Sequence, residues 1–281
     1  MKVILASTDF SETGNNAVKY AINFASAIKC NLIVFHAVHA PAIPPTMTPA
    51  EYRVLERNTE RFTQRMLDLV VDKLYSEVKQ KRYAQKVKTL AKNGIFVIDT
   101  VLSAAKQNSA DLIVVGTHGA TGLKLLGSIT SEIIFKATVP VLSVPPDIKF
   151  KKIASVLYSS DLMNLGPELK NILPIATTLK AGLEIVHFAN RDEQNEAKAF
   201  LAQAIRKVSY KKVKAIVINS AGQGTLIKHL QEYVNKKKPQ ILVLFPGERN
   251  FIDKLFVKSK TERLTYVSKL PLLSIRKSIV S

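Results

Sequence analysis

The chain repeats its own order of apolar segments, and this repeat limits the possible folds more than any other feature. Four strand-length apolar runs in the first half each have a counterpart in the second half, in the same order. The paired runs are residues 4–10 and 156–162, 31–38 and 182–189, 110–117 and 239–246, and 139–145 and 270–276. Self-similarity of this kind predicts two copies of one unit. We place the first copy at residues 1–147 and the second at residues 148–281, each of ordinary domain size.

Each unit has the pattern of an α/β fold. The runs are rich in valine and isoleucine and are mostly apolar at consecutive positions, which is typical of strands buried on both faces. Helical segments separate them, such as residues 12–28, where apolar side chains recur three and four positions apart. Alternating strands and helices predict a parallel sheet with helices packed against it.

The first copy contains about 20 more residues than the second between its second and fourth strands. Asp9 and Asp161 are 152 positions apart, whereas the closing strands are offset by 131. Part of the surplus is a proline-rich segment, residues 41–49, which cannot form the interior of a helix. We expect a long amphipathic helix to follow it, near residues 51–81.

Asp9 follows the first predicted strand directly. Ligands of open parallel sheets bind beyond the carboxyl ends of the strands, so this carboxylate could accept hydrogen bonds from a sugar or from the edge of a base. The simpler interpretation of the same stretch is that Asp9 and Ser11 cap the following helix.

A glycine-rich loop follows the fourth strand, at residues 116–122. Gly127 and Ser128 come next, just before a helical stretch at residues 131–137. A helix N-terminus offers free backbone N–H groups to a phosphate, and the hydroxyls of Ser128 and Thr130 could add donors. The alternative is a flexible loop in which Ser128 only caps the helix.

Taken together, these motifs resemble a tandem universal stress protein. The resemblance rests on TDFSET at residues 8–13, the strand ending in His36, GTHGATG at 116–122, GS at 127–128 and VPVLSVP at 139–145. It implies two tandem open parallel five-stranded sheets with strand order 3-2-1-4-5 and helices on both faces, a fold like that of the adenine-nucleotide alpha hydrolases. It also implies that the closing strands, Val139–Val144 and Leu270–Ile275, join the two halves as an intramolecular pseudo-dimer. Further dimerisation of whole chains is compatible with the sequence.

The resemblance further implies an ATP site in the first copy, with Mg as a possible companion ion. The nucleotide-binding residues carried over from the family pattern are Thr8, Asp9, Ala37, Val115, Gly116, Gly119, Gly127, Ser128, Ile129 and Thr130. Seven residues separate Gly119 from Gly127 here, whereas the family pattern has nine. The shortened loop therefore leaves two outcomes open, a loop that still reaches the nucleotide or one that closes over an emptied pocket.

The second copy departs further from the family pattern. Residues 245–250 retain one glycine and add Glu248, which would repel a phosphate, and Lys258-Ser259 replaces the Gly-Ser pair. Asp161 keeps the position of Asp9. We expect the second copy not to bind ATP in the family manner.

The charge of +19 is concentrated in the second copy. Residues 1–148 carry 17 basic and 12 acidic side chains, and residues 149–281 carry 24 and 10. Tryptophan is absent and aromatic residues make up 7%, so the stacking partners of a nucleic-acid groove are scarce. The preferred interpretation is a solvated basic surface, with nucleic acid and membrane as unfavoured partners.

The remaining features predict a cytoplasmic protein that is not an enzyme. Cys30 is the sole cysteine, and no apolar stretch is long enough for a signal peptide or a transmembrane helix. Neither a Walker A sequence, an HExxH motif nor a readable pair of carboxylates is present. We therefore predict a stress-response regulatory module that binds ATP or AMP in its first copy. The rival hypothesis is an interaction or scaffold protein with two degenerate pockets.

Overall fold

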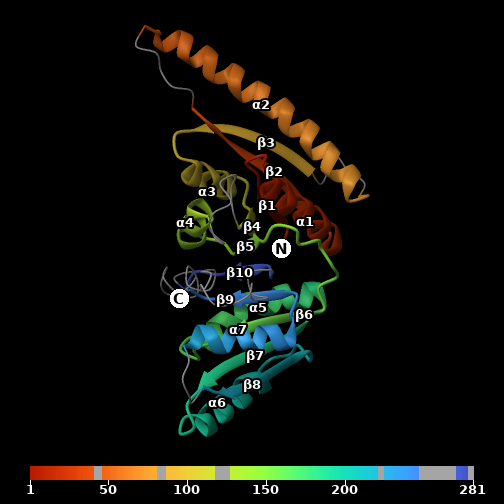
Figure 1. Ribbon diagram of the computed structural model, residues 1–281, viewed down its shortest axis with the longest axis vertical. Coiled ribbons are helices and arrows are strands. Elements are labelled where there is room, and N and C mark those ends of the chain that lie inside the picture. The colour runs from red at the N-terminus through yellow and green to blue at the C-terminus, as the bar shows by residue number, and fades with distance from the viewer. Residues whose placement is uncertain (41–45, 81–86, 118–126, 221–224, 247–269, 278–281) are drawn as a thin grey trace.

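A computed structural model describes residues 1–40, 46–80, 87–117, 127–220, 225–246 and 270–277. Strands and helices alternate through both halves of the chain (Figure 1). The first half contains β1 (Val3–Ser7), α1 (Glu12–Ile28), β2 (Asn31–His39), α2 (Pro49–Glu77), β3 (Val87–Gly94), α3 (Val97–Gln107), β4 (Leu112–Gly116), α4 (Ser128–Lys136) and β5 (Val141–Val144). The second half contains β6 (Ser155–Ser159), α5 (Leu165–Leu179), β7 (Gly182–Ala189), α6 (Gln194–Arg206), β8 (Val213–Asn219), α7 (Leu226–Lys237), β9 (Ile241–Leu244) and β10 (Leu272–Ser274).

The predicted strand order 3-2-1-4-5 is confirmed in each half. The sheet runs β3-β2-β1-β4-β5-β10-β9-β6-β7-β8, with parallel neighbours inside each half. The two predicted tandem sheets are continuous and form a single sheet of ten strands. The joint is the antiparallel pair β5 and β10, in which Leu142 faces Leu273. Because an unpaired edge strand exposes backbone hydrogen-bonding groups, this pairing satisfies both closing strands at once.

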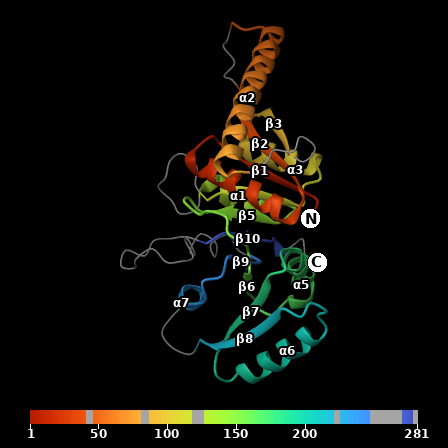
Figure 2. The same cartoon turned by 90° about the vertical axis from the view of Figure 1, so that its right-hand side faces the viewer.

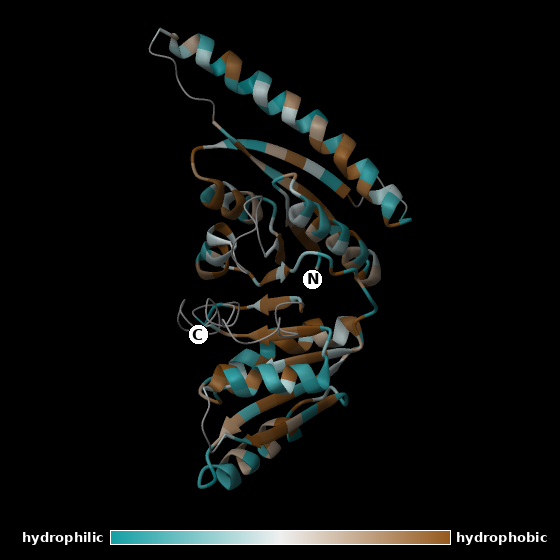
Figure 3. Ribbon diagram, viewed as in Figure 1, coloured by the Kyte–Doolittle hydropathy of each residue, from teal (hydrophilic) through white to brown (hydrophobic). Residues whose placement is uncertain are grey.

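Helices cover both faces of the sheet. In the second half, α7 lies on one face and α5 and α6 on the other (Figure 2). One cluster of buried side chains combines α1, α2, α5 and α6 with the sheet, and another combines α3, α4 and α7 with it. The central strands are accordingly hydrophobic along most of their length (Figure 3). Phe150, in the connection between the halves, packs edge-on against Tyr20 with ring centroids 5.2 Å apart.

The surplus residues of the first half include helix α2, which has 29 residues where α6 has 13. The helix that the sequence predicted near residues 51–81 begins and ends slightly earlier, at Pro49 and Glu77. Thr48 and Glu51 form a capping box at its start, and Pro49 occupies the first turn, where its missing N–H costs nothing. The N-terminal end of the helix extends beyond the sheet (Figure 1).

Helix α2 also covers the outer edge of β3. Gln64 Oε1 accepts a hydrogen bond from the backbone N–H of Ala91 at 2.7 Å, and Glu60 Oε2 accepts one from Asn93 at 3.2 Å. These side chains take the place of a neighbouring strand, which protects an edge that would otherwise invite pairing with another chain.

Candidate functional site

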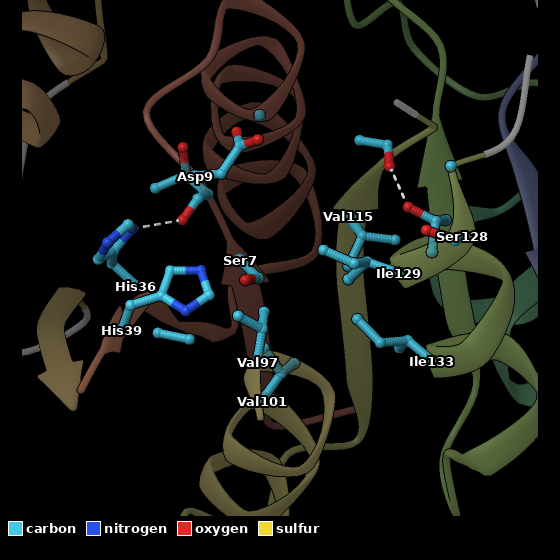
Figure 4. A pocket seen from close by; sticks show the side chains of 16 residues that line it. Ser7, Asp9, His36, His39, Val97, Val101, Val115, Ser128, Ile129 and Ile133 are labelled. Atoms are coloured by element: carbon cyan, nitrogen blue, oxygen red, sulfur yellow. Dashed lines mark hydrogen bonds between the residues drawn. The ribbon is translucent and has the colours of Figure 1, made fainter. Parts of the chain in front are cut away.

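A pocket opens at the carboxyl ends of the central strands of the first half. Strand β1 lies between β2 and β4, so the chain connections diverge to either side of it, the place where open α/β sheets bind ligands. The cavity has a volume of about 420 Å³, within the range of small-molecule sites. It is lined by Ser7, Thr8, Asp9, Gly14, His36, Ala37, His39, Val97, Val101, Val115, Gly116, Gly127, Ser128, Ile129, Thr130 and Ile133 (Figure 4).

Nine of the ten residues expected at a nucleotide site line this one cavity. They come from the turn after β1, from β2 and β4, and from the start of α4, which are widely separated in sequence. The tenth, Gly119, lies outside the described residues, as does the rest of the glycine-rich loop from residue 118 to 126. The fold thus brings together the described residues that the family pattern implies.

The turn after β1 is held by its own polar side chains. Thr8 Oγ1 accepts a hydrogen bond from the N–H of Phe10 at 3.0 Å, and Asp9 Oδ1 accepts one from the N–H of Ser11 at 3.0 Å. The Ser11 hydroxyl also donates to Asp9 Oδ1. Ser11 itself caps α1 by accepting from Gly14 N at 3.0 Å, so the capping role expected of Ser11 is confirmed. Asp9 acts on the cap through Ser11 and lines the cavity as an exposed carboxylate.

Two glycines allow the start of α1 to approach both this turn and the end of β4 closely. A Cβ atom on Gly14 would lie 2.5 Å from Asp9 Oδ1, and one on Gly116 would lie 2.9 Å from Thr13 Cγ2. Both distances are shorter than van der Waals contact allows. Any larger residue at either position would displace a wall of the cavity.

His36 belongs to the wall of the cavity and is tied to the turn after β1. Its Nδ1 lies 2.8 Å from the carbonyl oxygen of Thr8, and its ring stacks on Phe10 with centroids 4.2 Å apart. A carbonyl only accepts, so Nδ1 carries the proton. Burial, opposed by the Thr8 hydrogen bond and by the nearby Asp9 charge, lowers the pKa of His36 and favours the neutral ring.

The far side of the cavity is the N-terminus of α4. The helix begins at Ser128, three residues before the expected start, and its N-cap is Gly127 rather than Ser128. No side chain of the described residues caps it, so the first-turn N–H groups point outward without a side-chain acceptor from that part of the chain. The N–H of Gly127 donates to the carbonyl of Thr117 at 2.6 Å and ties the two ends of the glycine-rich loop together.

Thr130 requires a correction. We expected its hydroxyl to be a donor for phosphate oxygens, but the side chain is buried and Oγ1 donates to the carbonyl of Gly116 at 2.7 Å. The hydroxyl proton is therefore engaged in fixing α4 against the end of β4. Thr130 positions the helix N-terminus, and any contact with a ligand falls to its backbone N–H.

Other lining residues were not predicted from the sequence. Val97 and Val101 on α3 and Ile133 on α4 supply apolar surface, and Ser7, Gly14 and His39 complete the lining. Val97 and Val101 are four positions apart, as expected for one face of a helix, but nothing in the sequence showed which face of the sheet α3 and α4 cover. Gly14, directly after the TDFSET motif, is the signal in the sequence that marks the close approach of α1.

The second half builds the same turn. Ser160 Oγ accepts from the N–H of Leu162 at 3.0 Å, and Asp161 Oδ1 accepts from Met163 N at 3.1 Å. His187 Nδ1 lies 2.8 Å from the carbonyl of Ser160, as His36 does from Thr8. Leu162 has a φ of 66° where Phe10 has 64°. The repeat is therefore preserved at the level of individual hydrogen bonds.

Charge pairing distinguishes the two turns. In the second half, the ammonium group of Lys277 forms an ion pair with the carboxylate of Asp161. The counterpart of the glycine-rich loop, residues 247–269, lies outside the described residues.

A buried carboxylate further marks the second half. Glu168, on α5, is 1% exposed and accepts a hydrogen bond from the hydroxyl of Tyr158. Its counterpart in the first half is Asn16, a neutral side chain. Burial is the main reason that the pKa of Glu168 is raised; Asp161 raises it too, while the Tyr158 hydrogen bond and Lys277 oppose the shift.

Replacing Glu168 with Gln should stabilise the protein at neutral pH. A carboxyl group whose folded pKa is above its unfolded pKa costs stability as the pH rises through that window, because the folded state then binds more protons than the unfolded state. Gln keeps the acceptor for Tyr158 and cannot ionise. We expect a gain of about 1–2 kcal/mol at pH 7 that vanishes near pH 4, measured by urea denaturation. The exposed Glu196→Gln on α6 is the control, and equal gains in both variants would contradict the burial argument.

The fold and its pocket define a class, the doubly wound α/β proteins with a ligand site at the switch point of the strand order. Comparison with known proteins narrows this class. Residues 1–145 match the model of the universal stress protein family. The chain belongs to this family.

Individual relatives agree with this assignment. The chain is 28% identical to universal stress protein MJ0577 of Methanocaldococcus jannaschii over 152 residues, which covers 51% of this chain and 94% of the relative. It is 32% identical over 145 residues to universal stress protein A homolog 1 of Coxiella burnetii, covering 51% of this chain and 95% of the relative.

A solved structure extends the likeness to the second half. The crystal structure of a universal stress protein from Archaeoglobus fulgidus covers 98% of both chains with a TM-score of 0.71. Its sequence identity is 14%, so this match concerns the fold alone. Among the described residues, no helix combines the length and apolar character needed to cross a membrane.

Proposed function

We propose that the chain is a stress-response regulatory protein that binds an adenine nucleotide, ATP or AMP, in the pocket of its first half. The observation that carries the proposal is the convergence of nine residues of the nucleotide motif on one cavity at the switch point of the sheet. In this view residues 1–147 form the binding domain and residues 148–281 a second domain that has lost the site.

The chemistry of the cavity suits a nucleotide. Ala37, Val115 and Val101 offer an apolar surface for a base, and the Asp9 carboxylate can accept hydrogen bonds from a ribose or from the base edge. At the other wall the N-terminus of α4 offers the phosphates the positive end of the helix dipole and backbone N–H groups that no side chain of the described residues caps. Mg, where it accompanies ATP, would be held mainly by the phosphate oxygens.

The short glycine-rich loop is compatible with this role. Its two ends are anchored, since Gly127 donates to Thr117 and Thr117 N donates to the carbonyl of Val144 at 3.0 Å. Loop shortening therefore leaves the phosphate-binding helix end in place. The anchored loop ends therefore support nucleotide binding in the first half. They disfavour the alternative, in which neither half binds a nucleotide.

The second half is proposed to have a different role, because its counterpart of the Asp9 carboxylate is already paired. The ion pair between Lys277 and Asp161 neutralises the carboxylate that corresponds to Asp9. We infer that this half contributes the antiparallel β5–β10 joint, and hence an intramolecular pseudo-dimer, rather than a second nucleotide site. Signalling would then proceed through conformation and not through turnover.

The test is a binding measurement on the full chain purified without added nucleotide. The protein is denatured and the supernatant analysed for ATP and AMP by chromatography, and the nucleotide-free chain is titrated with ATP by calorimetry. We expect one site per chain. No retained nucleotide and no heat at millimolar ATP would overturn the proposal in favour of a scaffold protein, and steady phosphate release would favour an enzyme.

A further inference from the structure

Basic side chains gather at one edge of the second half, where its strands begin. Ten of them precede β6, β7, β8 or β9 or end the helices that lead to these strands, and all ten are exposed. We call this set the basic rim: Lys151, Lys152, Lys180, Arg206, Lys207, Lys211, Lys212, Lys236, Lys237 and Lys238.

The topology brings these residues together. In a parallel sheet all strands begin at one edge, and the helices that return the chain end at that same edge. The register places Ser155 beside Gly182, Leu183 beside Val213, and Val156 beside Ile241, so the first residues of β6, β7, β8 and β9 are aligned. Figure 1 shows the end of α7 and the starts of β7 and β8 on the right-hand side of the lower half. Clusters dispersed between residues 151 and 238 thus become one surface.

Helix dipoles explain only part of this charge. A cation near a helix C-terminus is stabilising, and each helix that returns the chain ends at this edge. In the first half α1, α3 and α4 have Lys29, Lys106 and Lys136 at the corresponding ends, and Lys79 follows the end of α2. The second half has Lys236, Lys237 and Lys238 at the end of α7 alone.

The charge of the rim is largely uncompensated within the described part of the chain. There, its one ion pair joins Lys237 Nζ to Glu184 Oε2 at 3.7 Å. Lys212 Nζ donates to the backbone carbonyl of Lys180 at 3.0 Å, which holds the side chain without neutralising it. Repulsion among so many like charges is relieved by a bound polyanion.

We propose that the basic rim binds double-stranded nucleic acid through the phosphates, without reading its sequence. The rim crosses four strands spaced about 4.8 Å apart, and a duplex carries one charge per about 1.7 Å of its axis, so several phosphates lie within reach at once. In the sequence these basic residues form separate short clusters, which favoured an ordinary solvated surface. The fold places the clusters side by side on one surface, and this favours a binding site for a polyanion.

Two other polyanions fit less well. Single strands need aromatic platforms, and the hydroxyl of Tyr210, the aromatic residue beside Lys211, is held by the carbonyl of Ala181 at 2.7 Å. An anionic membrane is bound most firmly when apolar side chains insert beside the charges. The large exposed apolar residues of the described second half lie elsewhere, at Met163, Phe200, Ile216 and Leu226.

The experiment measures binding of the full chain to a fluorescent DNA duplex of mixed sequence by anisotropy, between about 50 and 200 mM salt. The variant Lys152→Gln/Lys211→Gln/Lys236→Gln removes three rim charges. Because the salt slope is about 0.9 per phosphate contact, we expect its magnitude to fall by about 2.7 and affinity to fall more than about tenfold at low salt. The variant Lys152→Arg/Lys211→Arg/Lys236→Arg keeps the three charges and should bind the duplex like the parent.

The matched control removes three charges near the N-terminal ends of α5, α6 and α7, far from the rim at which these helices end: Lys170→Gln, Lys198→Gln and Lys228→Gln. It should leave the affinity and the slope unchanged. Absence of duplex binding at micromolar protein and low salt, or equal losses in both Gln triples, would overturn the proposal. Rim-dependent binding to phosphatidylserine vesicles without duplex binding would overturn it in favour of a membrane surface.

Discussion

Replacing Gly127 with Glu should abolish ATP binding by the full chain, with no heat of binding at millimolar nucleotide. Gly127 is the N-cap of α4, with φ −67° and ψ 152°, a conformation that any residue adopts. The backbone therefore accepts the change without strain. A carboxylate at this position faces the phosphates and competes for the first-turn N–H groups. At an effective dielectric of about 20, one like charge about 4 Å away costs about 4 kcal/mol, or nearly a thousandfold in affinity.

Two variants separate the charge from other effects of this change. Gly127→Ala adds bulk without charge and should keep affinity within about threefold of the parent, since Ala adopts the same backbone conformation and adds a single methyl group. Gly166→Glu adds the same charge in the first turn of α5, where a Cβ atom meets nothing within 4 Å, and should bind like the parent. Undiminished affinity in Gly127→Glu would show that nucleotide binds elsewhere.

The central part of the fold could be predicted because its strands are buried on both faces. β4 is buried along its whole length, and such a run is apolar without interruption. β3, at one end of the sheet, has no comparable run, and in β8, at the other end, the apolar run at residues 215–218 has no counterpart in the first half. β3 has one fully buried residue, Ala91, and its polar positions face α2 instead of a further strand. Their place in the sheet followed only from the family resemblance.

Some residues of the candidate site could likewise be predicted from the sequence, and others could not. Short motifs mark the residues that contribute backbone or turns, such as Asp9 and Gly127, because those roles require particular residue types. The apolar wall from α3 has no such mark, since Val97 and Val101 look like any helical core pair until the sheet order places them. The hydroxyl of Thr130 was misjudged for a related reason: its partner, the carbonyl of Gly116, is 14 positions away and contributes no side chain.

The repeat supplies its own control for the role of Asp9. Asp9→Asn should weaken ATP binding about 10- to 100-fold, whereas Asp161→Asn should leave it unchanged. Asn retains the oxygen that accepts from Ser11 N in the first turn and from Met163 N in the second, so both turns keep their geometry. What Asp9→Asn loses is the charge of an acceptor for a nucleoside hydroxyl or amine, and hydrogen bonds to charged groups contribute about 1.5–3 kcal/mol.

Asp161→Asn removes instead an ion pair with Lys277 at a partly exposed site, which costs about 0–1 kcal/mol of stability. Calorimetry with ATP and thermal melts of both variants therefore give opposite patterns, a loss of affinity in one and a small loss of stability in the other. Equal losses of affinity would mean that the second half binds nucleotide despite Lys277. No loss in either would mean that the Asp9 carboxylate does not touch the ligand, since the two turns are otherwise built alike from Thr8 and Ser160 onward.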